Sequence, residues 1–141
     1  MAEISYQHLP LAVRAGLVAA QRRCWAHLAQ PGTWHDGAKR IAIAAEVRNA
    51  RHCPYCAAQK DALSPNAVEG AHSGLGELSV AETDAVHRIA MDPARLSRDW
   101  YETNRAAGCG DEPYLELLSI VAMVTIIDMF TYALGLPDRF L

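Results

Sequence analysis

Two cysteines, Cys53 and Cys56, are separated by two residues in the segment RHCPYC, residues 51–56. A Cys-x-x-Cys pair can close a small disulfide ring, and basic neighbours such as His52 favour the thiolate over the thiol. Pro54 suits the first turn of a helix, where its missing N–H is not needed, so Cys53 is expected as the N-cap. The positive end of the helix dipole then falls on both sulfurs. This spacing predicts thiol–disulfide redox chemistry.

A carboxylate and an amine are expected beside the two thiols. At about 100° per residue, positions seven apart nearly eclipse on a helix, so Glu46, Cys53 and Lys60 share one side. Cys56 lies four positions before Lys60 and joins the same face. Lys60 is either a cation beside the Cys56 thiolate or a solvated helix residue. Glu46 is either a catalytic carboxylate or the partner of an arginine between residues 40 and 51, and His52 is either a proton shuttle or an exposed cation at a helix end.

The same two cysteines also permit a metal site. Zinc in a structural site takes four ligands and favours thiolate and imidazole. His72 and His87 could complete such a set, but neither stands in a paired spacing such as His-x-x-x-His. His87 is interpreted first as a packing histidine on an apolar helix face. A third alternative is an enzyme that does not use the cysteines and takes Glu46, His72 or His87 as acid and base. Redox chemistry is favoured, with no metal and no other cofactor predicted.

Two further cysteines stand alone in the sequence. Cys24 lies in an expected helix and is predicted to be a small buried side chain. Cys109 is predicted to be a loop thiol. Neither has an obvious partner, so neither is assigned to the redox pair.

Length and composition favour a single globular domain over residues 1–141. The chain is 51% hydrophobic and has a formal net charge of -3. This near-neutral balance gives no electrostatic reason to expect nucleic acid or an anionic membrane surface as a partner. The first residues show no basic segment followed by an apolar one, so the expected location is the cytoplasm, where structural disulfides are rare. The apolar run 117–127 is about half the length of a bilayer span and is expected to be a buried helix.

Hydrophobic periodicity predicts an all-α fold, because no segment alternates with period two over a useful length. Helices are expected at about 10–30, 37–50, 53–63, 79–91, 97–107 and 111–135. A capping-box pattern, Ser79 with Glu82, opens the fourth of these. Residues 64–78 form an expected surface connection that could cover the cysteines. The last helix is apolar nearly all round, and a small chain has little interior to wrap it, so a homo-oligomer through this helix is expected.

With these elements placed, the chain resembles the alkylhydroperoxidase D-like branch of the carboxymuconolactone decarboxylase family. The likeness runs from about residue 37 to 136. An Ala/Ile-rich helix leads into Cys-x-x-Cys, a Ser-Pro connection follows, and a long apolar helix ends in Ala-Leu-Gly. The family's redox members carry a glutamate in the helix before the motif and a histidine four positions after the second cysteine. Lys60 stands where that histidine belongs, and Ile41 stands at the usual position of the glutamate, with Glu46 nearer the motif.

The resemblance implies an all-helical protomer in a dimer, trimer or hexamer, and a peroxidase cycle. A thiolate attacks the distal oxygen of an organic or hydrogen peroxide to give a sulfenic acid, and the partner thiol condenses with it to the disulfide. A thiol reductant that the sequence does not identify then restores the pair. Family precedent makes Cys56 the attacking sulfur, whereas the N-cap position favours Cys53. The decarboxylase branch uses no cysteine pair.

The lysine at position 60 changes what the resemblance implies for proton transfer. The family histidine relays a proton to activate the second cysteine, and an amine is a poor base near neutral pH. Lys60 would therefore either act as a cation that stabilises the Cys56 thiolate or be desolvated until its own pKa falls. The alternative to a peroxidase is a redox-sensing or zinc-binding member of the same fold.

Overall fold

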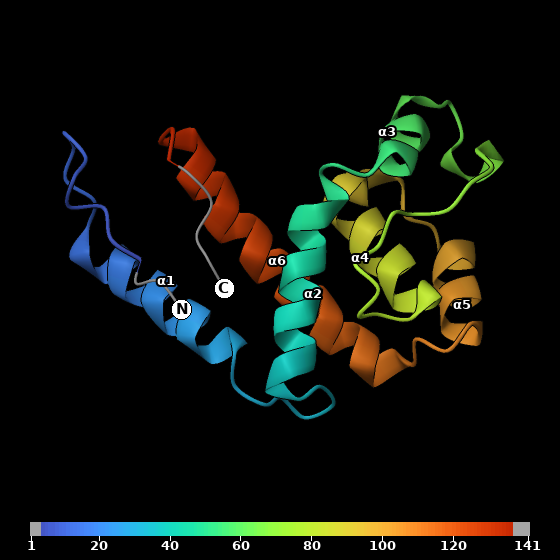
Figure 1. Cartoon of the computed structure of the whole chain (residues 1–141), viewed down its shortest axis with the longest axis horizontal. Coiled ribbons are helices and arrows are strands. Elements are labelled where there is room, and N and C mark those ends of the chain that lie inside the picture. Colours follow the sequence, from blue (N-terminus) through green and yellow to red (C-terminus); the bar gives the residue numbers. More distant parts are fainter. Residues whose placement is uncertain (1–3, 137–141) are drawn as a thin grey trace.

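The computed structural model describes residues 4–136, and in this part of the chain the regular elements are all helical (Figure 1). The α-helices are α1 (Ala15–Leu28), α2 (Gly37–Ala50), α3 (Pro54–Asp61), α4 (Val80–Met91), α5 (Arg98–Ala106) and α6 (Asp111–Ala133). Two short 3-10 helices lie in the connections, η1 (Pro65–Ala67) and η2 (Pro93–Arg95). The all-α prediction is confirmed.

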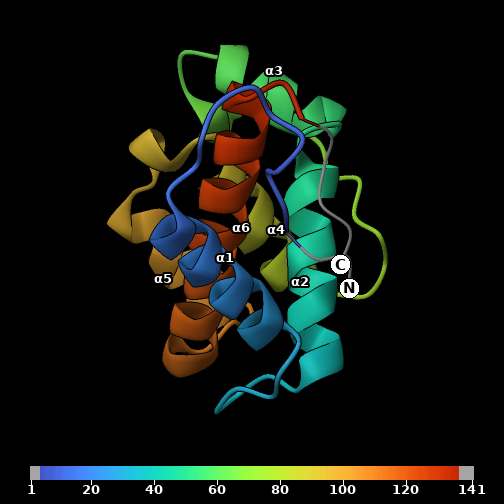
Figure 2. The same cartoon turned by 90° about the vertical axis from the view of Figure 1, so that its left-hand side faces the viewer.

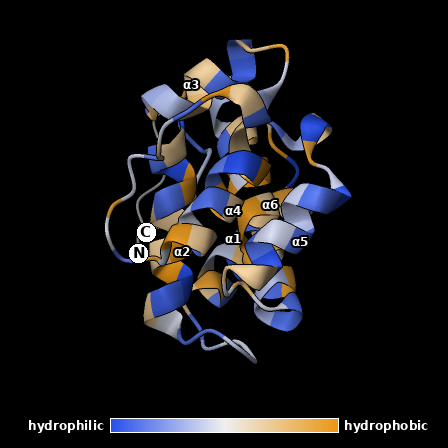
Figure 3. Ribbon diagram, turned by 90° about the vertical axis from the view of Figure 1, so that its right-hand side faces the viewer, coloured by the Kyte–Doolittle hydropathy of each residue, from blue (hydrophilic) through white to orange (hydrophobic). Residues whose placement is uncertain are grey.

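Helices α2, α4 and α6 form the centre of the molecule and contact one another extensively. Helix α1 lies along one side of this centre, against α2 and α6, and α3 and α5 pack on α4 (Figures 1 and 2). Figure 3 shows a largely hydrophilic α5 in front of a largely hydrophobic α6. Fully buried aliphatic side chains join the three central helices, among them Ile43, Val47, Val86, Leu117 and Val124. This packing fixes α2 and α4 relative to each other.

The helices begin where the sequence supplies caps. Asp36 accepts the backbone N–H of Lys39 at 2.8 Å and starts α2. The predicted capping box opens α4, with Ser79 Oγ accepting the Glu82 N–H at 3.2 Å and the Glu82 carboxylate accepting the Ser79 N–H at 2.8 Å. Cys53 is the N-cap of α3, as predicted. Local chemistry therefore determines where the elements that carry the site begin.

One of the two predictions about isolated cysteines is wrong. Cys24 is exposed, because the buried face of α1 consists of Gln21, Trp25 and Leu28. Cys109 lies in the loop between α5 and α6, as predicted, and its side chain is buried in the core cluster, which raises the pKa of its thiol. Helix α1 also begins later than the predicted residue 10, and its apolar face is only partly covered.

Helix α6 is buried on one side and exposed on the other. Large apolar side chains on its exposed side are Leu115, Ile126, Met129 and Tyr132. Within residues 4–136 it is also the one helix long and apolar enough to cross a membrane by length and composition. Its opposite side lies in the core against α2 and α4. A core helix can also meet these criteria of length and composition. The predicted homo-oligomer would use the exposed side.

Candidate functional site

A loop of residues 68–79 covers the two cysteines at the start of α3. The Tyr55 hydroxyl donates to the carbonyl of Val68 at 2.9 Å and ties this loop to α3. Gly70 passes directly over the Tyr55 ring with a φ of 148°, and an added Cβ would lie 2.8 Å from a ring carbon. Only glycine adopts this backbone without strain. The predicted covering of the cysteines by this connection is confirmed.

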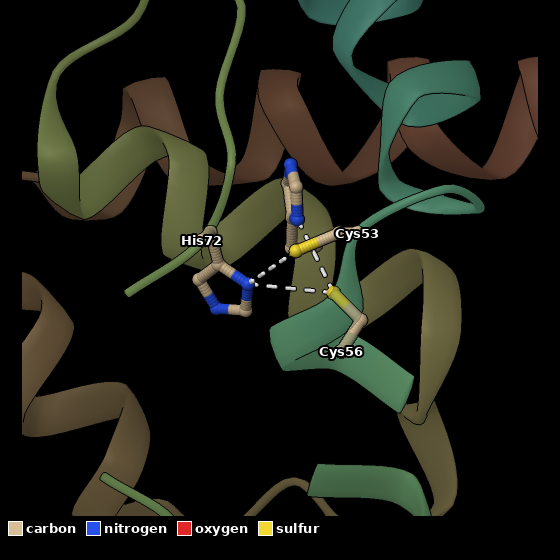
Figure 4. A group of neighbouring side chains, drawn as sticks. Cys53, Cys56 and His72 are labelled. Carbon is tan, nitrogen blue, oxygen red and sulfur yellow. Dashed lines mark hydrogen bonds between the residues drawn. The ribbon is translucent and has the colours of Figure 1, made fainter. Parts of the chain in front are cut away.

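Cys53 and Cys56 are both buried, and neither forms a disulfide. His72, from the loop, directs Nδ1 toward both sulfurs, at 3.7 Å from Cys53 Sγ and 3.3 Å from Cys56 Sγ (Figure 4). The backbone N–H of Ser73 donates to Cys53 Sγ at 3.4 Å. His87, from α4, places its Nδ1 3.2 Å from Cys56 Sγ. Each sulfur therefore faces an imidazole nitrogen.

The inner histidine, His87, belongs to a fully buried relay. Its Nε2 lies 2.7 Å from Glu46 Oε1, and both side chains are at most 1% exposed. Glu46 also accepts the Leu75 N–H at 2.9 Å and the Asn49 side-chain N–H at 2.8 Å. Burial disfavours the carboxylate, but hydrogen bonds from His87, Leu75 and Asn49 outweigh burial and lower the pKa of Glu46. The carboxylate holds Nε2–H of His87, which leaves Nδ1 to accept a proton from Cys56.

The outer histidine, His72, is held by a second carboxylate. Its Nε2 lies 3.0 Å from Asp84 Oδ1, and the Trp100 indole N–H donates to Asp84 Oδ2 at 2.7 Å. Burial disfavours the His72 cation, but hydrogen bonds with Asp84 and Cys53 raise its pKa. Burial likewise opposes the Asp84 charge, and hydrogen bonds from His72 and Trp100 lower its pKa. All three side chains line a cavity of about 580 Å³ between the loop, α4 and α5.

The two thiols differ in acidity. Burial alone would raise both pKa values, but the N–H groups of Cys56 and Ser73, together with His72, lower the pKa of Cys53 to about 6. Burial and the neighbouring Cys53 raise the pKa of Cys56 to about 12, against the opposing positive charge of Arg88. These contacts therefore favour the thiolate at Cys53 and the thiol at Cys56.

Lys60 and His52, which were predicted beside the sulfurs, are both exposed. The buried positions at the start of α3 are Cys53, Cys56 and Gln59, at a spacing of three residues. Lys60 follows Gln59 on the solvent side of this face. His52 lies in the turn between α2 and α3, where the helix is broken and a wheel drawn through both helices loses its meaning. The structure thus places neither cation at the site.

Glu46 does lie at the site, but through a contact that the sequence did not indicate. Its partners are His87, Asn49 and Leu75, and the alternative in which it pairs with an arginine is wrong. The three arginines pair elsewhere, Arg40 with Glu116 and both Arg48 and Arg51 with Asp128.

Four ligand atoms, the two sulfurs and the two histidine Nδ1 atoms, lie within 4.8 Å of one another. This is a donor set that zinc favours. The sequence offered both histidines only as weak ligand candidates, because 16 and 31 residues separate His72 and His87 from Cys56. Asp84 and Trp100 were not identified at all, since a carboxylate and an indole on separate helices carry no local pattern.

Comparisons with protein-family models, with curated proteins and with solved structures find no match to this chain. The resemblance to the alkylhydroperoxidase D-like family therefore depends on the sequence features that suggested it.

Proposed function

We propose that this protein is a thiol–disulfide oxidoreductase that reduces organic or hydrogen peroxides through Cys53 and Cys56. One observation carries the proposal. The two buried cysteines of the Cys-x-x-Cys pair lie against two histidines, and each histidine is hydrogen-bonded to a carboxylate. Peroxide reduction by a dithiol has a step that needs a proton donor and a step that needs a proton acceptor. The two histidines offer one group for each step.

In the first step, Cys53 is the attacking sulfur. Three donors, the Cys56 and Ser73 N–H groups and His72, face its sulfur and stabilise the thiolate. The thiolate attacks the distal oxygen of the hydroperoxide ROOH, the O–O bond breaks, and Cys53 becomes a sulfenic acid. His72, whose cation Asp84 stabilises, gives its proton to the departing alkoxide, which leaves as ROH. The cavity beside His72 accommodates the organic group R.

In the second step, Cys56 resolves the sulfenic acid. Its thiol passes a proton to Nδ1 of His87, and the Glu46 carboxylate stabilises the imidazolium. The Cys56 sulfur then attacks the Cys53 sulfur, and the hydroxide that leaves takes the proton from His87 and departs as water. Together the steps convert one thiolate, one thiol, one proton held on His72 and ROOH into a disulfide, ROH and water. A thiol reductant outside this chain must reduce the disulfide.

The family resemblance supports this proposal, although the histidine of the proposed relay comes from a different position in the chain. In the family a histidine relays a proton to the second cysteine, and here His87, held by Glu46, lies 3.2 Å from Cys56 Sγ. The histidine comes from α4, so an exposed Lys60 at the family position has no part in the relay. A reducing compartment such as the cytoplasm would keep the pair ready for reaction.

The experiment that tests the order of attack uses two serine variants, both in a Cys24→Ser background that removes the exposed thiol. After one equivalent of cumene hydroperoxide, Cys56→Ser is expected to accumulate a sulfenic acid at Cys53 that dimedone traps. Cys53→Ser is expected to react no faster than free cysteine. Trapping in Cys53→Ser alone would reverse the order of the sulfurs, and trapping in neither variant would contradict the proposed function.

A further inference from the structure

We propose that the reduced protein binds one Zn²⁺ ion between Cys53, Cys56, His72 and His87. In a tetrahedral zinc site, with Zn–S of about 2.3 Å and Zn–N of about 2.0 Å, a sulfur and a nitrogen ligand lie about 3.5 Å apart. Three of the four Sγ to Nδ1 distances are 3.7, 3.3 and 3.2 Å, and all four donor atoms lie within 4.8 Å of one another. These three sulfur–nitrogen pairs are thus already within a few tenths of an ångström of the spacing in a zinc site.

The orientation of both histidines is that of metal ligands. Each presents Nδ1 to the sulfurs and is held through Nε2 by a carboxylate, His87 by Glu46 and His72 by Asp84. Histidines bound to zinc almost always donate their other N–H to such a partner, which fixes the tautomer and the ring orientation. A single histidine would be enough to deprotonate one thiol. Here two histidines face the cysteine pair, and together with the two sulfurs they form a set of four zinc ligands.

Burial and charge also suit a divalent cation. Cys53 and Cys56 are 3% exposed and His87 is fully buried, and two thiolates at such a site would neutralise the charge of Zn²⁺. The Ser73 N–H bonded to Cys53 Sγ supports that ligand from outside the set. His72 lines the cavity of about 580 Å³, which gives the ion an entry path from one side.

Zinc binding does not depend on peroxidase activity, but the release of zinc rests on the proposed function. When ROOH oxidises the two thiolates, they lose two electrons and form the S–S bond, and ROOH takes up two protons and leaves as ROH and water. The ion then loses two of its four ligands. Zinc binding and disulfide formation therefore compete for the same two sulfurs.

The test is a titration of reduced, full-length protein with Zn²⁺ under anaerobic conditions, in competition with a chromophoric chelator. One equivalent of zinc is expected to bind. With Co²⁺ in place of zinc, the protein is expected to show the absorption of a tetrahedral site and sulfur-to-cobalt charge transfer. His72→Gln removes one ligand and keeps both thiols, and it is expected to weaken zinc affinity by at least about tenfold. His35→Gln, at a buried histidine bonded to the Pro113 carbonyl, is the matched control.

Three results would each overturn the zinc site: no uptake in competition with the chelator, an octahedral cobalt spectrum, or unchanged affinity in His72→Gln. Oxidation by cumene hydroperoxide is measured separately, on chelator-treated protein, so that the two proposals fail independently. Fast oxidation without zinc uptake overturns the zinc site alone. Zinc uptake by a protein whose thiols react no faster than free cysteine supports the site and overturns the peroxidase.

Discussion

Two histidines at the cysteine pair occupy different surroundings and so have different chemistry. His72 contacts both sulfurs and borders a cavity, whereas His87 is fully buried beside Cys56. An imidazole stabilised as a cation near the cavity suits proton donation to a leaving alkoxide. An imidazole held by Glu46 suits proton acceptance from a buried thiol. At the residue scale, the proposed cycle therefore makes separate predictions for its two steps.

Glu46→Gln is expected to slow disulfide formation by roughly 10²-fold, because an amide does not stabilise the His87 imidazolium. Sulfenic acid formation at Cys53 should keep its rate. Rapid mixing with peroxide, followed by dimedone trapping and mass spectrometry, measures both steps. Urea denaturation checks the fold, where a loss of about 1–3 kcal/mol is expected for a weakened buried hydrogen bond. Glu82→Gln, outside the cysteine site, is the control. Equal slowing of both steps would contradict the relay.

Lys60→Ala is expected to leave the oxidation rate unchanged within about twofold, because the side chain is exposed and α3 keeps its buried face. One of the two interpretations from sequence, a cation beside the Cys56 thiolate, predicts the opposite, a slower reaction. Stopped-flow oxidation of this variant against the wild type separates the two expectations. A loss of tenfold or more would place Lys60 back in the mechanism.

Part of the site is predictable from the sequence because it is local. The cysteine pair and its N-cap follow from Pro54 and the two-residue spacing, which concern adjacent residues only. His72 and His87 come from a loop and from α4, and no local spacing relates them to Cys56. Lys60 was placed at the site because it lies four residues after Cys56 in one helix, but the buried face of α3 runs through Cys56 and Gln59 and leaves Lys60 exposed. Contacts between elements are decided by packing, which periodicity does not describe.

At the scale of elements, the short helix α3 is held at both ends. Tyr55 ties its first turn to the loop, and Arg95 of η2 binds the carbonyls at its C-terminus. The guanidinium donates to the carbonyls of Gln59, Lys60 and Ala62 at 2.7, 3.1 and 2.6 Å. Carbonyls without intrahelical partners favour a cation at this end of a helix. An eight-residue helix is marginal without such contacts.

Arg95→Gln is expected to lower the free energy of unfolding by about 1–2 kcal/mol and to speed amide hydrogen exchange in α3. The loss follows from removing charge-assisted hydrogen bonds to carbonyls that keep no other helical donor. Urea denaturation and exchange followed by mass spectrometry measure the two effects. Arg98→Gln, at a side chain that is 88% exposed, is the control. Unchanged exchange across residues 54–61 would show that Arg95 does not hold this helix.

At the scale of the whole molecule, α6 presents one continuous exposed stripe. Leu115, Ser119, Ala122, Ile126 and Met129 are exposed and follow one another at spacings of three and four residues. Two small side chains lie between large apolar ones there, and an apolar stripe of this kind is typical of a helix that packs against another. We propose that a second copy of the chain covers this stripe.

Light scattering after size exclusion is expected to give a dimer or a larger homo-oligomer at micromolar concentration. Ile126→Glu with Met129→Glu is expected to dissociate it, because two charges would be buried in an apolar interface. Val80→Glu, at an exposed apolar residue on the first turn of α4, provides the matched control. A monomeric wild type would contradict the predicted interface.

The sequence predicts helix ends well, because capping residues are local. It predicts burial poorly, because burial depends on contacts with residues far away in the sequence. The bounds of α2 are as predicted, and the capping box at Ser79 opens α4 at the expected place. Cys24 was assigned the wrong burial, since only the contacts of α1 with its neighbours decide which of its side chains are covered. Amphipathic periodicity shows that a helix has two faces but not how fully a neighbour covers one.

The most direct test of the peroxidase proposal is the rate at which reduced, chelator-treated protein loses thiols to stoichiometric cumene hydroperoxide. The proposed cycle predicts loss of two thiols per chain, roughly 10²-fold or more faster than free cysteine. Mass spectrometry should then locate one intramolecular disulfide between Cys53 and Cys56, with Cys24 and Cys109 still reduced. Thiols that are lost no faster than those of free cysteine would contradict a peroxidase at this site.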